Sequence, residues 1–308
     1  MIKSPLITVV VPVFNTARYV SMCVESILSQ SFVDFELVIV DDGSTDNSYE
    51  ICLNYALKDK RVKLYQQSNQ GVTVARRTGV VNAKGEFICF VDSDDMLNTS
   101  GLEQLALYAK PDTDIVISGT SMNSVLSGGE FVKMTLEGEL LNSVCARLYR
   151  RRLLSDDVFA APRTLAIGED AIMNVRVGLG VEGKIQCFID NIYQYTYNPM
   201  SVTRNMELTL SYEEFYISQL IVALGNKKQL YYDSLQRSNM KTLENLIVGR
   251  ITVPYSREWV KELICWGKSQ NLSIRHWILL NIKSNLIAKF MLALEKRLAM
   301  IFGKYEKV

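Results

Sequence analysis

Short apolar runs alternate with longer segments of periodic apolar residues along the first part of the chain. The apolar runs predict strands covered on both faces, and the periodic segments predict helices. The predicted strands are residues 6–14, 35–40, 62–65, 87–91 and 114–118. The predicted helices occupy residues 16–28, 47–55 and 72–83. This alternation indicates an α/β fold with a mostly parallel sheet and flanking helices.

Beyond the fifth predicted strand the pattern is less regular. Gly128 and Gly129 mark a turn, after which residues 131–136 are predicted to form an edge strand. Residues 184–189 and 192–197 are predicted to pair with each other as two strands.

The C-terminal part has a helical pattern from about Leu208 onward, most clearly over residues 272–302. Residues 275–308 carry seven lysines and arginines against two glutamates. A basic amphipathic helix of this kind can dock on an anionic membrane surface. Packing on the rest of the protein, on a partner subunit or on a second copy of the chain fits the same pattern. We therefore expect a domain at residues 1–205 and a helical region at 206–308.

Composition indicates which partners the protein binds and in which cellular compartment it is found. Thirty-four Lys and Arg residues against 33 Asp and Glu give a net charge of +1, which argues against a nucleic-acid binder. No signal-peptide pattern precedes the first strand, so a cytoplasmic location is expected, with the inner face of the cell membrane as an alternative. The cysteines form no CxxC pair and are interpreted as buried thiols of a reducing compartment. They are Cys23, Cys52, Cys89, Cys145, Cys187 and Cys265.

Three carboxylates follow the fourth predicted strand within four positions: Asp92, Asp94 and Asp95. Side chains two apart on an extended chain point the same way, so Asp92 and Asp94 can converge. Carboxylates suit Mg²⁺ or Mn²⁺, and Mg²⁺ typically binds through one or two carboxylates plus substrate phosphates. The alternative is a solvated acidic turn in which Asp95 or Ser100 caps the next helix.

Other polar residues also follow predicted strands, at the edge where an open α/β sheet binds its ligands. Several sequence blocks in this order resemble the family 2 glycosyltransferases of the Rossmann-like GT-A fold. The blocks are residues 8–15 (TVVVPVFN), 26–32 (SILSQSF), 36–46 (ELVIVDDGSTD), 69–77 (NQGVTVARR), 85–95 (GEFICFVDSDD) and 168–170 (GED). The resemblance covers about the first two-thirds of the chain.

The resemblance implies a site for a nucleotide-diphosphate sugar. Asp41, or its neighbour Asp42, would accept from the base imide of a uracil nucleotide. A turn or helix cap is the plainer interpretation of Asp42. Arg76 would lie near the nucleotide or diphosphate, unless it is an ordinary surface arginine of its helix. The residues implied to border the base pocket are Pro12, Phe14 and Asn15.

The resemblance also implies the roles of the acidic residues. Asp94 would bind Mn²⁺ or Mg²⁺, Asp92 would reach the ribose or a metal-bound water, and Asp95 would support them. Asp170 would be the catalytic base that activates the acceptor hydroxyl, with Glu169 on the acceptor side. At a helix start Asp170 is also an ordinary carboxylate stabilised by the helix dipole.

The implied activity is inverting transfer of a hexosyl or N-acetylhexosaminyl group from a UDP-sugar. The implied acceptor is a glycan or lipid-linked saccharide in bacterial surface polysaccharide synthesis. A non-catalytic nucleotide-sugar-binding protein is the alternative. A sugar-nucleotide pyrophosphorylase is disfavoured, because the chain has no glycine before Gly43 and so lacks a Gly-rich loop after the first strand.

Three positions depart from the family pattern: Arg77 where Asn is frequent, Arg147 where Lys is frequent, and Thr196 where a basic residue is common. If a basic side chain holds the leaving diphosphate, another residue must supply it. The candidates are Arg204, Arg150, Arg151 and Arg152. The plainer interpretation of the run at residues 147–152 is a solvated basic helix end.

Overall fold

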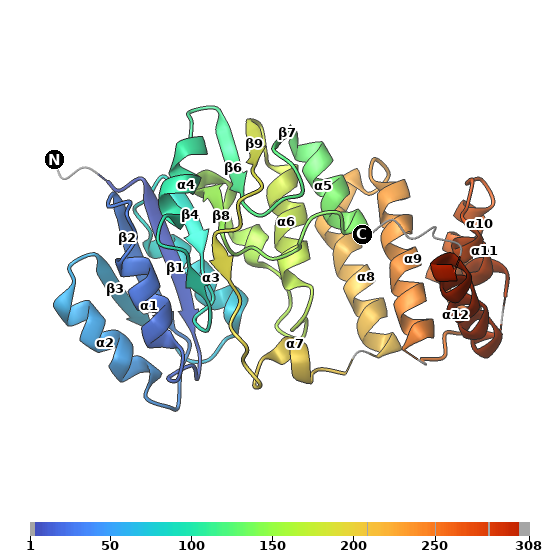
Figure 1. The fold of residues 1–308 in the computed structure, drawn as a ribbon, viewed down its shortest axis with the longest axis horizontal. Coiled ribbons are helices and arrows are strands. Elements are labelled where there is room, and N and C mark those ends of the chain that lie inside the picture. Colours follow the sequence, from blue (N-terminus) through green and yellow to red (C-terminus); the bar gives the residue numbers. More distant parts are fainter. Residues whose placement is uncertain (1–3, 208, 250, 283, 302–308) are drawn as a thin grey trace. The chain divides into compact units, whose positions relative to one another are not determined.

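The structure, a computed structural model, describes residues 4–207, 209–249, 251–282 and 284–301. It divides into two compact units, which are described separately (Figure 1). The first comprises Met1–Thr135 and Glu139–Met206, and the second comprises Leu136–Gly138 and Glu207–Val308.

The first unit is built on an eight-stranded sheet with the order β3-β2-β1-β4-β8-β6-β9-β7. β3, β2, β1 and β4 are parallel neighbours, whereas β8 pairs antiparallel with both β4 and β6. The mostly parallel α/β sheet predicted from the sequence is thus confirmed. The strands of this sheet are β1 Ile7–Val13, β2 Phe35–Asp41, β3 Val62–Gln66, β4 Phe87–Phe90, β6 Thr113–Ile117, β7 Ser124–Leu126, β8 Arg147–Arg150 and β9 Lys184–Cys187.

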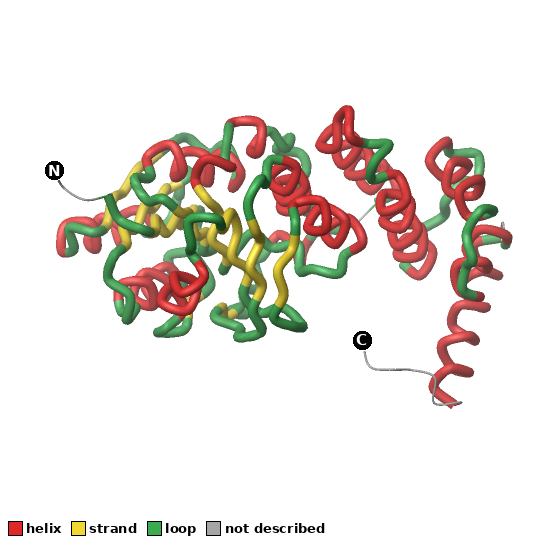
Figure 2. Tube along the Cα trace, turned by 90° about the horizontal axis from the view of Figure 1, so that it is seen from above, coloured by secondary structure: helices red, strands yellow, loops and turns green. Residues whose placement is uncertain are grey.

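Helices lie on both sides of the strands (Figure 2). Every residue of β1 and β2 is buried, which explains why these strands read as continuous apolar runs. The helices of this part of the chain are α1 Val20–Leu28, α2 Ser48–Lys58, α3 Val72–Asn82, α4 Gly101–Tyr108, α5 Gly128–Glu137, α6 Glu169–Leu179 and α7 Val202–Asn205. Short 3-10 helices are η1 Arg151–Leu153 and η2 Asp156–Phe159.

The edge strand predicted at residues 131–136 is wrong, because this segment belongs to α5. Ser127 and Glu130 form a reciprocal capping box at the start of the helix. The Ser127 N–H donates to the Glu130 carboxylate at 2.8 Å, and the Glu130 N–H donates to Ser127 Oγ at 3.3 Å. Phe131 and Thr135, one helical turn apart, are both buried. β7 takes the place at the sheet edge instead.

The predicted pairing of residues 184–189 with residues 192–197 is also wrong. β9 lies between β6 and β7, whereas β10 (Tyr193–Gln194) pairs antiparallel with β5 (Met96–Leu97) in a separate two-stranded sheet. The chain therefore leaves the main sheet after β9. It then passes directly over the turn that carries the acidic cluster.

The basic run that starts at Arg147 is not a solvated helix end. Its first four residues form β8, in the interior of the sheet, and Arg147 is almost completely buried. The Arg147 guanidinium donates to Asn174 Oδ1 at 3.2 Å, and it lies over the ring of Phe131. The cysteines follow their prediction with one exception, since five of the six are buried and Cys265 is exposed.

The second unit is helical and has its own apolar core, which includes Leu243, Leu263 and Leu279. Its helices are α8 Leu210–Leu224, η3 Gly225–Lys227, α9 Tyr232–Val248, α10 Glu258–Gly267, α11 Ile274–Asn281 and α12 Asn285–Ile301. The helical pattern predicted over residues 272–302 is therefore split between α11 and α12. Within the described ranges no helix has the length and apolar character needed to cross a membrane.

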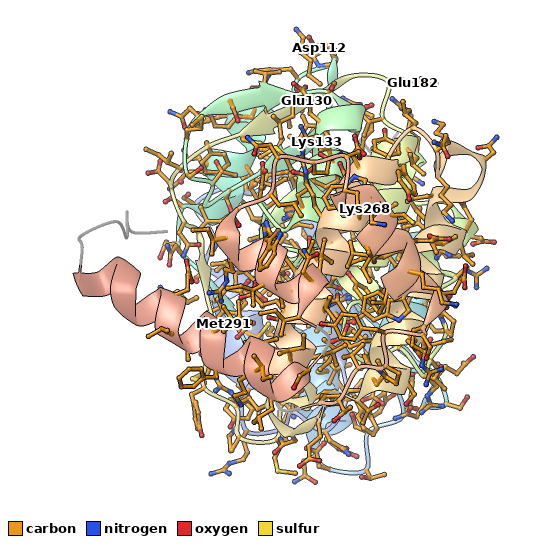
Figure 3. The ribbon with its side chains drawn as sticks, turned by 90° about the vertical axis from the view of Figure 1, so that its right-hand side faces the viewer. Asp112, Glu130, Lys133, Glu182, Lys268 and Met291 are labelled. Atoms are coloured by element: carbon orange, nitrogen blue, oxygen red, sulfur yellow. The ribbon has the colours of Figure 1, made fainter. Side chains whose placement is uncertain are left out.

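Two sides of α12 carry apolar residues. Ala288 and Leu292 are buried in the core of the second unit, and Met291, labelled in Figure 3, is partly buried against it. Leu286 and Phe290 are exposed. Leu208, Lys283 and residues 302–308 lie outside the described residues, so part of the stretch predicted to contact a membrane does too. Membrane contact and a homodimer stay predictions.

One glycine allows α3 to approach β1 closely. A Cβ added at Gly79 would lie 2.3 Å from Cγ1 of Val10, which is itself fully buried. This close packing fixes the height of α3 above the sheet. It thereby fixes the starting point of the Arg76 side chain, one turn earlier on the same helix.

Gly79→Ala is expected to destabilise the protein even though alanine favours helix. Overpacking a core costs about 1–3 kcal/mol, whereas the gain in helix propensity is about 1 kcal/mol. Chemical denaturation measures the free energy of unfolding. Gly180→Ala is the matched control, because its added Cβ would meet nothing closer than 3.5 Å. A Gly79→Ala protein as stable as the native one would contradict this account of the packing.

Candidate active site

The acidic cluster follows β4 at the carboxyl edge of the parallel strands and is held by a segment from much later in the chain. Asn198 Nδ2 donates to Asp94 Oδ2 at 2.8 Å, and the Thr196 N–H donates to Asp95 Oδ1 at 2.7 Å. The Asp92 N–H donates to the hydroxyl of Tyr193 at 3.1 Å. Burial raises the pKa of Asp95 to about 6. The cluster is therefore an ordered arrangement rather than a loose solvated turn.

The chemistry of these carboxylates fits a divalent cation that is held mainly by its substrate. No group of three or more His, Cys, Asp or Glu side chains among the described residues could hold a metal ion. Asp94 is partly exposed, and Asn198 occupies only one of its oxygens. Asp95 is buried and bonded to backbone, so it supports the turn. A site with one or two carboxylates suits Mg²⁺ or Mn²⁺ that also binds phosphate oxygens.

Arg76 joins this cluster to the residue expected to be the base. Its Nη2 lies 3.0 Å from Asp92 Oδ1, and its Nη1 lies 2.7 Å from Asp170 Oδ1. The arginine side chain is 3% exposed. Burial lowers the pKa of the guanidinium, but Asp170 and Asp92 outweigh it, so the pKa lies well above its ordinary value. Arg76 is thus a permanent positive charge between two carboxylates, not a surface arginine.

Asp170 and Glu169 open α6. Gly168 precedes them with φ 94°, a left-handed conformation that favours glycine. Asp170 Oδ2 accepts from the Val144 N–H at 3.2 Å, so both of its oxygens have partners. Burial, followed by the negative charge of Asp170, raises the pKa of Glu169 from 4.5 to about 7, whereas Arg76 acts in the opposite direction. The two adjacent acids therefore have different environments.

Asp41 and Asp42, at the end of β2, are both buried but differ in their partners. Asp42 accepts from Gln67 Nε2 at 2.8 Å, from the Gln70 N–H at 2.9 Å and from the Gly71 N–H at 2.7 Å. It therefore shapes the loop before α3 and does not cap α2. Asp41 Oδ2 accepts from Ser44 and Gln66, whereas the buried Asp41 Oδ1 has no partner within the described part of the chain.

The three residues expected at the base pocket lie at or after the end of β1. Pro12 is buried in the strand, whereas Phe14 is 45% exposed. Asn15 is also exposed and has φ 52°. Asn15 Oδ1 accepts from the Thr45 N–H at 2.8 Å, which ties the end of β1 to the turn after β2. These contacts leave the Phe14 side chain at the surface beside the Asp41 turn.

Three of the four arginines suggested for the diphosphate lie at the wrong edge of the sheet. Arg150 is in register with Phe87, the first residue of β4, and it pairs with Glu86. Arg151 Nε donates to the Gly85 carbonyl at 2.8 Å, and Arg152 pairs with Asp114 at 2.7 Å. These positions correct the suggestion for Arg150, Arg151 and Arg152, because the acidic cluster follows the other end of β4. Arg204, whose guanidinium lies 4.6 Å from the ring centroid of Tyr197, is the remaining candidate.

Comparison with known proteins decides the family. Residues 8–173, more than half of the chain, match the family described as Glycosyl transferase family 2. The chain belongs to this family. The match contains Asp41, Arg76 and Asp92, and it also contains the Glu169–Asp170 pair. The site residues from Tyr193 onward lie outside the matched part. The other site residues described above lie within the part shared with other family 2 glycosyltransferases.

Curated relatives are glycosyltransferases by name. Glycosyltransferase GlyG of Streptococcus pneumoniae serotype 4 is 45% identical over 130 residues, which cover 42% of this chain and 43% of GlyG. The putative glycosyltransferase EpsH of Bacillus subtilis (strain 168) is 27% identical over 275 residues, which cover 83% of this chain and 78% of EpsH. The matched part therefore spans less than half the length of GlyG.

Solved structures show the fold. TarS residues 1–349 of S. aureus, in complex with UDP-GlcNAc, superimposes with a TM-score of 0.71 at 20% identity. The superposition covers 98% of this chain and 93% of that one. The mannosyltransferase PcManGT of Pyrobaculum calidifontis, in complex with GDP-Man and Mn²⁺, gives a TM-score of 0.51 at 16% identity and covers 94% of this chain and 87% of that one. The predicted GT-A architecture is thus confirmed.

Sequence reasoning missed several residues of this family 2 site. Asn198 and Tyr193 hold the acidic cluster, and Val144 supplies a backbone N–H to Asp170. Asn198 is the one with a visible signal, since it lies two residues after Thr196, which departs from the family pattern. A backbone donor such as the Val144 N–H leaves no signal in a single sequence.

The raised pKa of Glu169 predicts a pH dependence of stability. Between about pH 4.5 and 7 the native state binds more protons at Glu169 than the unfolded state, so the free energy of unfolding falls as pH rises. Glu169→Gln removes this contribution. Denaturation at pH 5 and at pH 7.5 should show a smaller loss of stability with rising pH for Glu169→Gln than for the native chain.

Glu182→Gln is the control for this experiment, because Glu182 is an exposed carboxylate (labelled in Figure 3). It should keep the native pH dependence. Identical pH profiles for the native and Glu169→Gln proteins would contradict the burial of a titrating carboxyl group at this position.

Proposed function

We propose that the chain is an inverting glycosyltransferase that moves a sugar from a nucleotide-diphosphate donor to a saccharide acceptor. One observation carries the proposal: Asp92, in the acidic cluster, and Asp170, at the start of α6, contact the same buried guanidinium at 3.0 and 2.7 Å. A donor-side carboxylate and an acceptor-side carboxylate therefore meet in a single site. We assign this site to a catalytic domain at residues 1–205, followed by a helical region at 206–308.

A UDP-sugar is the proposed donor. Asp41 supports this choice, because its Oδ1 is buried and lacks a partner among the described residues, and a carboxylate can only accept. The imide N–H of uracil is a donor of the matching kind. Pro12, Phe14 and Asn15 lie beside this turn and would border the base. TarS, which shares the fold, was crystallised with UDP-GlcNAc. A hexosyl or N-acetylhexosaminyl group is the proposed cargo.

Asp94 would hold a Mn²⁺ or Mg²⁺ ion through its available oxygen. Asp92 would contact the ribose or a metal-bound water, and Asp95 would brace the turn from beneath. When bound, the ion supplies positive charge beside the departing diphosphate. PcManGT was crystallised with Mn²⁺ and GDP-Man. Arg204 would add a further positive charge on the diphosphate side.

Asp170 would take the proton of the acceptor hydroxyl as its oxygen attacks the anomeric carbon. Attack from the face opposite the diphosphate inverts the configuration, and no covalent enzyme intermediate is needed. Glu169 would shape the acceptor side. We propose a glycan or lipid-linked saccharide of a bacterial surface polysaccharide as the acceptor, with the enzyme acting at the inner face of the cell membrane.

Asp94→Ala is expected to lose metal-dependent donor binding. A screen of UDP- and GDP-sugars with Mn²⁺ identifies the donor by thermal stabilisation, since a bound ligand stabilises the native state by mass action. Loss of the Asp94 ligand should weaken the Mn²⁺-dependent affinity for that donor at least about tenfold. The control is Asp112→Ala, because Asp112, labelled in Figure 3, is exposed and pairs with Lys184. Equal Mn²⁺-dependent affinities of the Asp94→Ala and native proteins would exclude Asp94 as a ligand.

Asp170→Asn is expected to keep donor binding and to lose turnover by about 10²-fold or more, since general-base catalysis contributes 10²–10⁴-fold. Release of UDP from the donor identified by the screen, with water or a glycan as acceptor, measures turnover. A non-catalytic nucleotide-sugar-binding protein would bind the donor without releasing UDP. Native turnover in Asp170→Asn would remove this residue from the role of base.

A further inference from the structure

The resemblance assigns Arg76 to the nucleotide or diphosphate, but its contacts are of another kind. Both terminal nitrogens of the guanidinium are engaged by carboxylates, Nη2 by Asp92 and Nη1 by Asp170. The Nε is buried without a partner among the described residues. A diphosphate would have to compete with these two carboxylates for the same donors.

The backbone of Arg76 is fixed independently of any ligand. Arg76 and Ala75 are buried on α3, and Gly79 lets this helix pack directly on β1. The guanidinium carbon lies 6.0 Å from the centre of the Phe90 ring, at the end of β4. The side chain is therefore anchored between a rigid helix and the sheet. Its charged end is placed where the two carboxylates meet.

Charge explains why a cation is needed there. Asp92 and Asp170 come from segments 78 positions apart in the sequence, and the carboxyl of Glu169 adjoins Asp170. Without a positive charge between them, these acids would repel one another in a partly desolvated site. The planar fork of arginine can bond to two carboxylates at once, whereas the ammonium of lysine is a single point charge.

We propose that Arg76 is a positioning residue for the transfer step: it fixes the carboxylate of Asp170 relative to the donor-side Asp92, and it does not bind the diphosphate. The inference rests on the proposed function, in which Asp170 is the base. One group thus sets the distance between the two halves of the site before any substrate arrives. Effective general-base catalysis needs this fixed geometry.

The two possible roles of Arg76 predict different effects of its substitution on the affinity for UDP and on turnover. If Arg76 binds the diphosphate, its substitution weakens the affinity for UDP. If Arg76 positions Asp170, its substitution lowers turnover and leaves the affinity for UDP close to native, because no contact to the nucleotide is removed. Arg76→Lys is the informative variant, since it keeps the positive charge and can reach only one carboxylate.

The experiment measures the dissociation constant of UDP with Mn²⁺ and the kcat of UDP release from the donor found by the screen. Arg76→Lys should change the dissociation constant less than about threefold and lower kcat at least about tenfold. Arg77→Lys is the matched control, because Arg77 is the next residue of α3 and pairs with the exposed Asp156. It should behave as native in both measurements. A tenfold weaker UDP affinity with an unchanged kcat for Arg76→Lys would overturn the inference.

A double-mutant cycle on the free energy of unfolding tests the inference even if a variant loses all activity. Arg76→Gln leaves two acids without their counter-charge, so it should destabilise the native chain more than it destabilises Asp170→Asn, in which one of those acids is already neutral. Equal losses of stability in the two backgrounds would show that the guanidinium does not hold Asp170. Native turnover of the Asp170→Asn single variant would instead contradict the proposed function itself, whatever Arg76 does.

Discussion

The pairing of the buried Arg76 guanidinium with the partly exposed carboxylates of Asp92 and Asp170 is the constraint on which the site depends. It joins the end of β4, the middle of α3 and the start of α6. Removal of the guanidinium would leave these carboxylates without their counter-charge. The packing around Arg76 holds these three elements in place. Gly79 brings α3 close to β1, and Gly168 precedes α6, whose second residue, Asp170, meets the guanidinium.

The second half of the site tolerates a divergent sequence because much of it is held by backbone groups. Thr196 stands where relatives often carry a basic residue, yet its contact to Asp95 is made by its N–H, which nearly every residue can supply. Asp170 is likewise held by the N–H of Val144. Asn198, which donates a side-chain amide to Asp94, and Tyr193, whose hydroxyl accepts from the Asp92 N–H, tie particular residue types to the cluster. A departure from the family pattern at residue 196 therefore leaves this contact intact.

The parallel half of the sheet could be predicted from the sequence because each strand there is a short apolar run ending in polar residues. β8 breaks that rule. It runs antiparallel to β4, so the residues that follow it emerge at the opposite edge, and Arg150 to Arg152 are carried away from the acidic cluster. Strand direction is a long-range property that local composition does not encode. The pairing of β10 with β5 escaped prediction for the same reason, whereas the capping box of Ser127 and Glu130 was a local signal outweighed by the apolar run after it.

The two adjacent acids at the start of α6 have different environments, which bears on the roles proposed for them. Both side chains are carboxylates, and a carboxylate can act as a general base. Asp170 is paired with Arg76 and accepts the Val144 N–H, so both oxygens of its carboxylate are held in place. Glu169, by contrast, has no such ion pair, and burial together with the negative charge of Asp170 raises its pKa to about 7. A base must be aimed at a fixed point, and the contacts of Asp170 to Arg76 and to Val144 fix the position of its carboxylate. The contact with Arg76 therefore supports the proposed role of Asp170 as base independently of its place in the Gly-Glu-Asp block.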